Sequence, residues 1–84
     1  MTVGENIKNA RKKAGLTQKE LGQKIGLSYQ SIAQWENNLR KPKPETLQKL
    51  ANALGITIWE LSAGSSGIDF LYVLATKLQK HEDE

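Results

Sequence analysis

Side chains that form hydrogen bonds without carrying charge are concentrated near the middle of the sequence. Tyr29, Gln30 and Gln34 lie close together, and the two glutamines are four residues apart. In a helix this spacing places both amides on one face. A Gln amide can bond N6 and N7 of adenine together, and the major groove of DNA admits a helix. The stretch therefore predicts a helix that reads DNA bases, and the alternative is an ordinary polar surface.

The flanking residues predict two short helices joined by a tight turn. Four apolar residues form two pairs at helical spacing, Leu21 with Ile25 and Ile32 with Trp35. Between the pairs, Gly26 allows the left-handed backbone that ends a helix. We expect Leu27 to pack inward and Ser28 to cap the second helix, which is predicted at 28–36. This arrangement is the helix-turn-helix pattern.

Capping signals and apolar spacing predict three more helices around this pair. A Thr followed three residues later by Glu marks a helix start, and the chain has three such boxes: Thr2 with Glu5, Thr17 with Glu20, and Thr57 with Glu60. The first helix is predicted at 3–14, on an apolar stripe of Val3, Ile7, Ala10 and Ala14. The fourth is expected from Pro44 to Gly55, and the fifth ends near Leu61. The predicted fold is an all-α bundle of five helices.

The composition limits the class of protein. A chain of 84 residues has room for one small domain. It contains no cysteine, so disulfides and thiolate metal sites are excluded. No apolar run approaches the roughly 20 residues that span a bilayer, and the first residues are too polar for a signal peptide. We therefore expect a cytoplasmic protein without a membrane segment.

Charge is unevenly distributed along the chain. Residues 1–63 carry a net charge of +5 and residues 64–84 carry −2. A basic body favours a polyanionic partner, although solubility alone is the alternative explanation. Three cations stand beside the predicted helix-turn-helix, and we expect them to contact phosphates rather than only solvent: Lys19, Arg40 and Lys41.

The end of the chain differs in composition from the rest. Residues 63–67, AGSSG, indicate a flexible hinge. Beyond it, a sixth helix is favoured within 68–84, and a strand at 70–74 is the competing interpretation. One face of that helix would be apolar, with Ile68, Leu71, Tyr72, Ala75 and Leu78. Because this face is too hydrophobic for a solvated arm, we expect it to form a homodimer contact together with Trp59.

Over residues 3–62 the sequence resembles the Cro and lambda-repressor type of helix-turn-helix domain, also called the xenobiotic-response-element family. The matching segments are Ile7 with Arg11, GLTQKELGQKIGLS at 15–28, Ser31-Ile32 with Trp35-Glu36-Asn37, Pro42, and LQKLANALGIT at 47–57. The resemblance implies a compact five-helix bundle that binds double-stranded operator DNA, usually as a dimer. It also implies a transcriptional regulator, most often a repressor.

The resemblance assigns roles to individual residues. Tyr29, Gln30 and Gln34 stand where the family reads bases. The expected DNA-backbone contacts are Gln18, Lys19, Ser28, Ser31, Asn37, Arg40 and Lys41. Gln18 would also support the reading helix, and Arg11 with Glu36 would form a buried ion pair.

Four positions depart from the family pattern. Asn38 replaces a common glycine, but asparagine tolerates the left-handed conformation, so we expect the turn to be preserved. Ala33 replaces a longer polar residue, which leaves fewer direct base contacts. Trp59 replaces a polar residue and Glu60 stands where an aromatic is common, so apolar surface is expected to shift outward.

An enzymatic function is not supported by the sequence. The chain has a single histidine, His81, and it lacks a Gly-rich phosphate loop and a nucleophile–base pair. We therefore expect no cofactor and no metal. Two alternatives to a simple regulator remain open. One is an antitoxin whose tail binds a toxin while the body binds DNA, and the other is a protein-interaction module that does not bind DNA.

Overall fold

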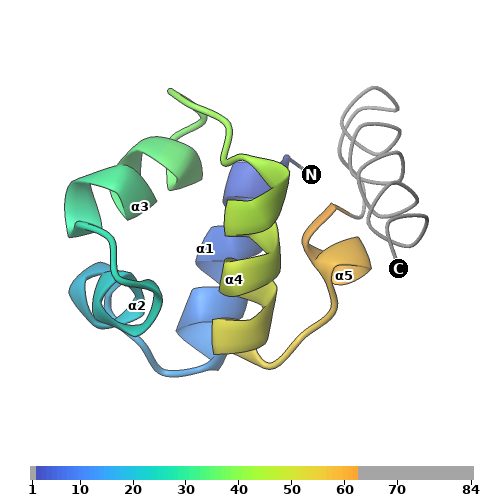
Figure 1. Ribbon diagram of the computed structural model, residues 1–84, viewed down its shortest axis with the longest axis horizontal. Coiled ribbons are helices and arrows are strands. Elements are labelled where there is room, and N and C mark those ends of the chain that lie inside the picture. The colour runs from blue at the N-terminus through green and yellow to red at the C-terminus, as the bar shows by residue number, and fades with distance from the viewer. Residues whose placement is uncertain (1, 63–84) are drawn as a thin grey trace.

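The computed structural model describes residues 2–62 of the chain (Figure 1). This part contains five helices and no strand: α1 (Val3–Lys13), α2 (Gln18–Ile25), α3 (Tyr29–Glu36), α4 (Pro44–Leu54) and α5 (Ile58–Ser62). The predicted five-helix bundle is confirmed, with α1 ending one residue earlier than expected. The predicted hinge at 63–67 and the tail at 68–84, whether helix or strand, lie outside the described residues.

Side-chain caps fix the starts of four of the five described helices, whereas α4 begins with Pro44 and has no side-chain cap. All three predicted capping boxes are present, with Glu N–H to Thr Oγ1 distances of 3.1, 3.0 and 3.2 Å for α1, α2 and α5. In each box the Glu carboxylate accepts a hydrogen bond from the Thr backbone N–H. The hydroxyl of Ser28 accepts from the N–H of Ser31 at 3.4 Å and caps α3. These bonds satisfy donors that the first turn of a helix leaves unpaired.

Helices α1 to α4 end in the same backbone motif. A left-handed residue reverses the chain, and the next N–H returns to a carbonyl in the last turn. Glycine holds that position after α1, α2 and α4. After α3 it is Asn38, with φ of +60°. The prediction that asparagine preserves this turn is confirmed, because its short side chain tolerates the left-handed conformation.

The core lies where the five helices meet (Figure 1). Helices α1 and α4 occupy the centre, with α2 and α3 on one side and α5 on the other. The predicted apolar positions Leu21, Ile32 and Trp35 are buried, as are Ile7 of α1 and the apolar residues of α4. Ala14 is exposed because the helix ends before it. Helix α3 packs against both α1 and α2, so its inner side is fully occupied.

Two glycines permit close approach to α3. A Cβ on Gly22 would lie 2.6 Å from the carbonyl oxygen of Leu27, so only glycine fits at this close crossing of α2 and the start of α3. A Cβ on Gly4 would collide with the carbonyl oxygen of Trp35. The prediction that Leu27 packs inward is wrong, since its side chain is 41% exposed. Its backbone, rather than its side chain, fills the space against Gly22.

Candidate nucleic-acid interface

The outer side of α3 gathers the residues predicted to read bases. Tyr29 is 51% exposed, Gln30 is exposed and Gln34 is half-buried. Asn37, the residue that caps the C-terminal end, is also exposed. None of these side chains carries charge at neutral pH, and all can donate or accept hydrogen bonds. The structure therefore places the predicted set on one accessible surface.

Exposed apolar side chains are concentrated at the two ends of α3. Leu27 precedes the helix, Tyr29 begins it, and Leu39 follows it with 74% of its surface exposed. Leu39 directly follows the left-handed residue Asn38 and lies in the loop beyond α3. Methyl groups and an aromatic ring beside two amides suit a surface that contacts thymine methyls as well as polar base edges.

A buried ion pair attaches the inner side of α3 to α1. Arg11 Nε lies 2.7 Å from Glu36 Oε2, and Arg11 Nη2 lies 3.1 Å from Oε1. The side chains are 11% and 2% exposed respectively. The hydrogen bond to Glu36 raises the pKa of Arg11, and this effect exceeds the opposing effect of burial. A third bond, from Arg11 Nη1 to the carbonyl of Leu16 at 2.8 Å, ties in the loop before α2.

Gln18 joins this network from the start of α2. Its Nε2 donates to Glu36 Oε1 at 3.1 Å, and the side chain is half-buried. This bond is the support for the reading helix that the resemblance implied. An amide nitrogen carries two hydrogens, so the bond to Glu36 leaves one for a phosphate. The phosphate contact itself remains a prediction.

The remaining predicted backbone contacts surround α3. Lys19, Arg40 and Lys41 are exposed, and the two serines are linked at the start of the helix, with 3.3 Å between Ser28 Oγ and Ser31 Oγ. The sequence did not predict the contact from Arg40, whose Nη1 donates to Gln34 Oε1 at 3.4 Å. The residues are six apart, which is not a helical spacing. The left-handed turn at Asn38 brings the two residues together. An asparagine directly after the predicted helix is the feature of the sequence that indicates this turn.

Trp59 does not belong to this surface. It lies on α5 with 38% of its area exposed, and Figure 1 shows α5 at the end of the molecule opposite α3. The expected outward shift of apolar surface at this position is therefore present. The other residues of the predicted dimer contact, Ile68, Leu71, Tyr72, Ala75 and Leu78, lie outside the described residues.

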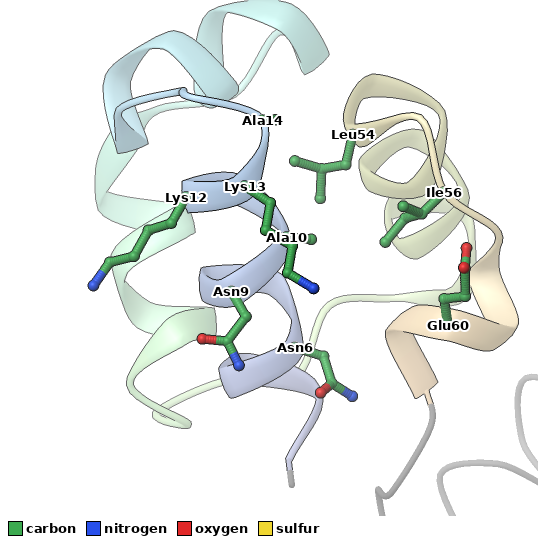
Figure 2. Close-up of a pocket in the computed structure, with 9 residues that line it drawn as sticks. All are labelled: Asn6, Asn9, Ala10, Lys12, Lys13, Ala14, Leu54, Ile56 and Glu60. Atoms are coloured by element: carbon green, nitrogen blue, oxygen red, sulfur yellow. The ribbon is translucent and has the colours of Figure 1, made fainter.

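A groove runs along α1 on the side facing α5 (Figure 2). Apolar side chains come from Ala10, Leu54 and Ile56, and polar ones include Asn9, Lys13 and Glu60. Lys12 borders the groove but points away from it in Figure 2. Asn6 is already used, since its Nδ2 donates to the carbonyl of Leu61 at 2.8 Å and holds α5 against α1.

Within residues 2–62 no group of three His, Cys, Asp or Glu side chains could hold a metal ion. Across the same residues no helix is long and apolar enough to cross a membrane.

Known proteins match the part of the chain that contains this interface. Residues 7–61 match the helix-turn-helix family. The transcriptional regulator ImmR of Bacillus subtilis is 37% identical over 57 residues, which is 68% of this chain and 45% of that protein. The immunity repressor of Bacillus phage phi105 is 43% identical over 58 residues, 69% of this chain and 40% of that protein. The chain thus spans less than half the length of these two relatives.

A solved structure shares the fold. The c2 repressor of Salmonella phage P22, crystallised with a synthetic operator, superposes with a TM-score of 0.72 at 35% sequence identity. The superposition covers 77% of this chain and 98% of the repressor chain. The family match at residues 7–61 includes the whole of α2, α3 and α4. The chain belongs to the Cro/C1-type helix-turn-helix family, whose members are DNA-binding transcription regulators and not enzymes.

Proposed function

We propose that this protein is a sequence-specific DNA-binding transcriptional repressor that reads a palindromic operator through the major groove. The observation that carries the proposal is the two-sided character of α3. Its outer side presents uncharged hydrogen-bonding groups, including Gln30 and Gln34, while its inner side is held rigidly by the Arg11–Glu36 pair. A rigid helix with amides on its accessible side can place those amides against base edges.

Cations on both sides of α3 support the same function. Lys19 lies on α2, and Arg40 and Lys41 lie in the loop after α3; all three are exposed. Phosphate contacts from such residues fix the orientation of a protein on the duplex and make binding depend on salt. The relatives reported above, a transcriptional regulator and phage repressors, favour repression over activation. The cytoplasm, where bacterial and phage DNA is transcribed, is the location that this function requires.

The proposal includes a homodimer. A single α3 covers only a few base pairs, and dimers of this class place two reading helices about 34 Å apart, one turn of DNA. Trp59 and the apolar face predicted within 68–78 are the proposed contact. Because α5 lies opposite α3 (Figure 1), a contact there leaves both reading surfaces accessible.

The test is selection of duplexes from a random pool, followed by affinity measurements on a selected and a scrambled duplex at two salt concentrations. Gln30→Ala should cost about 1–3 kcal/mol on the selected duplex and much less on the scrambled one. Gln23→Ala, which removes an exposed amide from α2 instead, is the matched control and should change neither affinity.

Two results would count against the proposal. Equal losses for Gln30→Ala on both duplexes would show that the amide does not read sequence. Complete lack of salt-dependent binding would favour the alternative of a protein-interaction module. Copurification of a small basic partner would instead support an antitoxin whose tail binds a toxin.

A further inference from the structure

The groove between α1 and α5 leaves apolar surface uncovered within residues 2–62 (Figure 2). Ala14, the last member of the apolar stripe predicted for α1, is exposed, and Ala10 and Ile56 are only half-buried. Leu54 forms another part of the lining. Small side chains such as alanine let a second helix approach closely. The groove therefore resembles a helix-packing surface on which the described residues place no helix.

The chain reaches the edge of this groove where the described residues end. Asn6 lines the groove and holds the end of α5, since its Nδ2 lies 2.8 Å from the carbonyl oxygen of Leu61. Helix α5 ends at the next residue, Ser62. The predicted hinge at 63–67 can span at most about 18 Å, whereas α1 is about 16 Å long. The segment after the hinge can therefore reach any part of the groove.

The helix predicted after the hinge has apolar residues on two opposite sides. One side is the proposed dimer contact, with Ile68, Leu71, Tyr72, Ala75 and Leu78. Phe70, Val73 and Leu74 follow the i, i+3, i+4 spacing and share the other side. A helix that is apolar all round is buried all round, so contact with a second copy alone would leave the second side in water. This second side requires an apolar surface of its own.

Charges at the groove complement those of the same segment. Lys13 and Glu60 line the groove, and neither belongs to an ion pair within the described part of the chain. The predicted helix offers a partner for each, because Asp69 precedes Phe70 and Lys77 continues the side that Phe70 begins. Exposed ion pairs add little affinity, but complementary charges help to fix the orientation in which two surfaces meet.

The hinge decides which copy of the chain supplies the segment. A short flexible linker gives a tethered segment an effective concentration in the millimolar range, so a segment of the same chain outcompetes that of a second copy at micromolar concentration. We infer that residues 68–78 fold back on their own domain and cover the α1–α5 groove with Phe70, Val73 and Leu74. The opposite side of the helix then stays available for the proposed dimer. The inference does not depend on the DNA-reading function.

The experiment uses the full chain with one nitroxide spin label. Thr76→Cys provides the attachment site, because the chain has no cysteine and Thr76 lies between the two apolar sides of the predicted helix. In a proton–nitrogen NMR spectrum the amide signals of Ala10, Ala14 and Ile56 should lose most of their intensity relative to the same sample with the label reduced. The signal of Gln30 is the internal control and should keep its intensity, because α3 lies at the opposite end of the molecule from α5 (Figure 1).

Two matched pairs of variants test the contact from both surfaces. Leu74→Ser should restore the weakened signals, whereas Leu71→Ser, on the dimer side, should leave them weak. In the groove, Ala14→Arg should restore the remaining signals, and Gln23→Arg, which adds the same side chain to the exposed surface of α2, should not. Thermal melting identifies the variants that are folded, and either pair alone decides the question.

A mixed sample identifies the copy that supplies the segment. An isotope-labelled chain without the nitroxide is combined with an unlabelled chain that carries it. Because the contact is intramolecular, the groove signals of the isotope-labelled chain should keep their intensity.

Three results overturn the inference. They are groove signals as intense as that of Gln30, equal effects of Leu74→Ser and Leu71→Ser, and a comparable loss of intensity in the mixed sample, which would assign the groove to the segment of a second copy. Failure of the other proposals looks different. A monomeric chain whose groove signals are weakened removes the dimer alone, and a chain that selects no duplex from the pool removes the DNA-reading function alone.

Discussion

Replacing Arg11 by methionine tests how α3 is held in place. The substitution keeps an unbranched apolar chain but removes three hydrogen bonds, two to Glu36 and one to the carbonyl of Leu16. Glu36 would remain 2% exposed in its side chain, with only the amide of Gln18 as donor. A buried carboxylate without its cation is strongly unfavourable.

The size of the effect follows from this burial. Removing one partner of a buried ion pair costs about 3–5 kcal/mol. A helical domain of about 60 residues has a total stability of about 3–9 kcal/mol at typical values per residue. Arg11→Met should therefore lose a large share of the free energy of unfolding. Replacing both partners, as in Arg11→Met with Glu36→Leu, should be far less costly, since apolar residues of similar volume can substitute for a buried pair.

Urea unfolding followed by circular dichroism measures these differences. Lys12→Met is the matched control, because it makes the same class of change at the next, exposed position of α1, and it should change stability by less than about 0.5 kcal/mol. A similar small loss for Arg11→Met and Lys12→Met would refute the reasoning. So would a double variant as unstable as the sum of the two single variants.

Three further predictions concern packing, pH and assembly. Gly4→Ala gains about 1 kcal/mol of helix propensity, but its Cβ would collide with carbonyl oxygens at the end of α3. Because overpacking outweighs the gain, the free energy of unfolding measured in urea should fall by about 1–2 kcal/mol. A more stable variant would contradict this. Hydrogen bonds from Thr17 lower the pKa of Glu20, the one from the backbone N–H having the larger effect and the one from the side chain the smaller. The ionised Glu20 carboxylate therefore stabilises the fold fully above the ordinary pKa range of Glu, and this stabilisation is lost as pH falls through the lowered pKa. Glu20→Gln should therefore be less stable than wild type at neutral pH, with a difference that narrows in acid; a constant difference would argue against this origin. A chain ending at Ala63 should sediment as a monomer and the full chain as a dimer; a full chain that is monomeric at high micromolar concentration would show the dimer prediction to be wrong.

Local rules explain why so much of the fold could be predicted from the sequence. Capping boxes such as Thr17 with Glu20 act over three residues, and left-handed glycines act within one turn. Both can therefore be recognised in the sequence without knowledge of the tertiary structure. Periodic burial of Leu21 and Ile32 follows from spacing alone. The part of the candidate site that lies on α3 could also be predicted, because helical spacing determines which side chains share a face.

Predictions failed or fell short where residues meet through space. Leu27 follows the apolar pattern, yet the close approach of its backbone to Gly22 leaves its side chain at the surface. The bond from Arg40 to Gln34 depends on a turn whose direction is set by Asn38, and no spacing rule reports it. Gly4 indicated a close contact only weakly. A glycine inside a helix is unfavourable, and the structure shows that the carbonyl oxygen of Trp35 leaves no room for a Cβ at this position.

The arrangement around α3 separates stability from recognition along a single helix. Its inner side is anchored by Glu36, where buried charge makes substitution costly, and its outer side carries Gln30, where substitution should alter base preference with little effect on folding. Gln34 lies between the two: it is half-buried, its carbonyl closes the turn after the helix, and its amide is directed by Arg40. A change in the loop can therefore move the Gln34 amide without altering the helix itself. On this reasoning, Arg40→Ala should release the Gln34 amide while the buried ion pair keeps α3 in place.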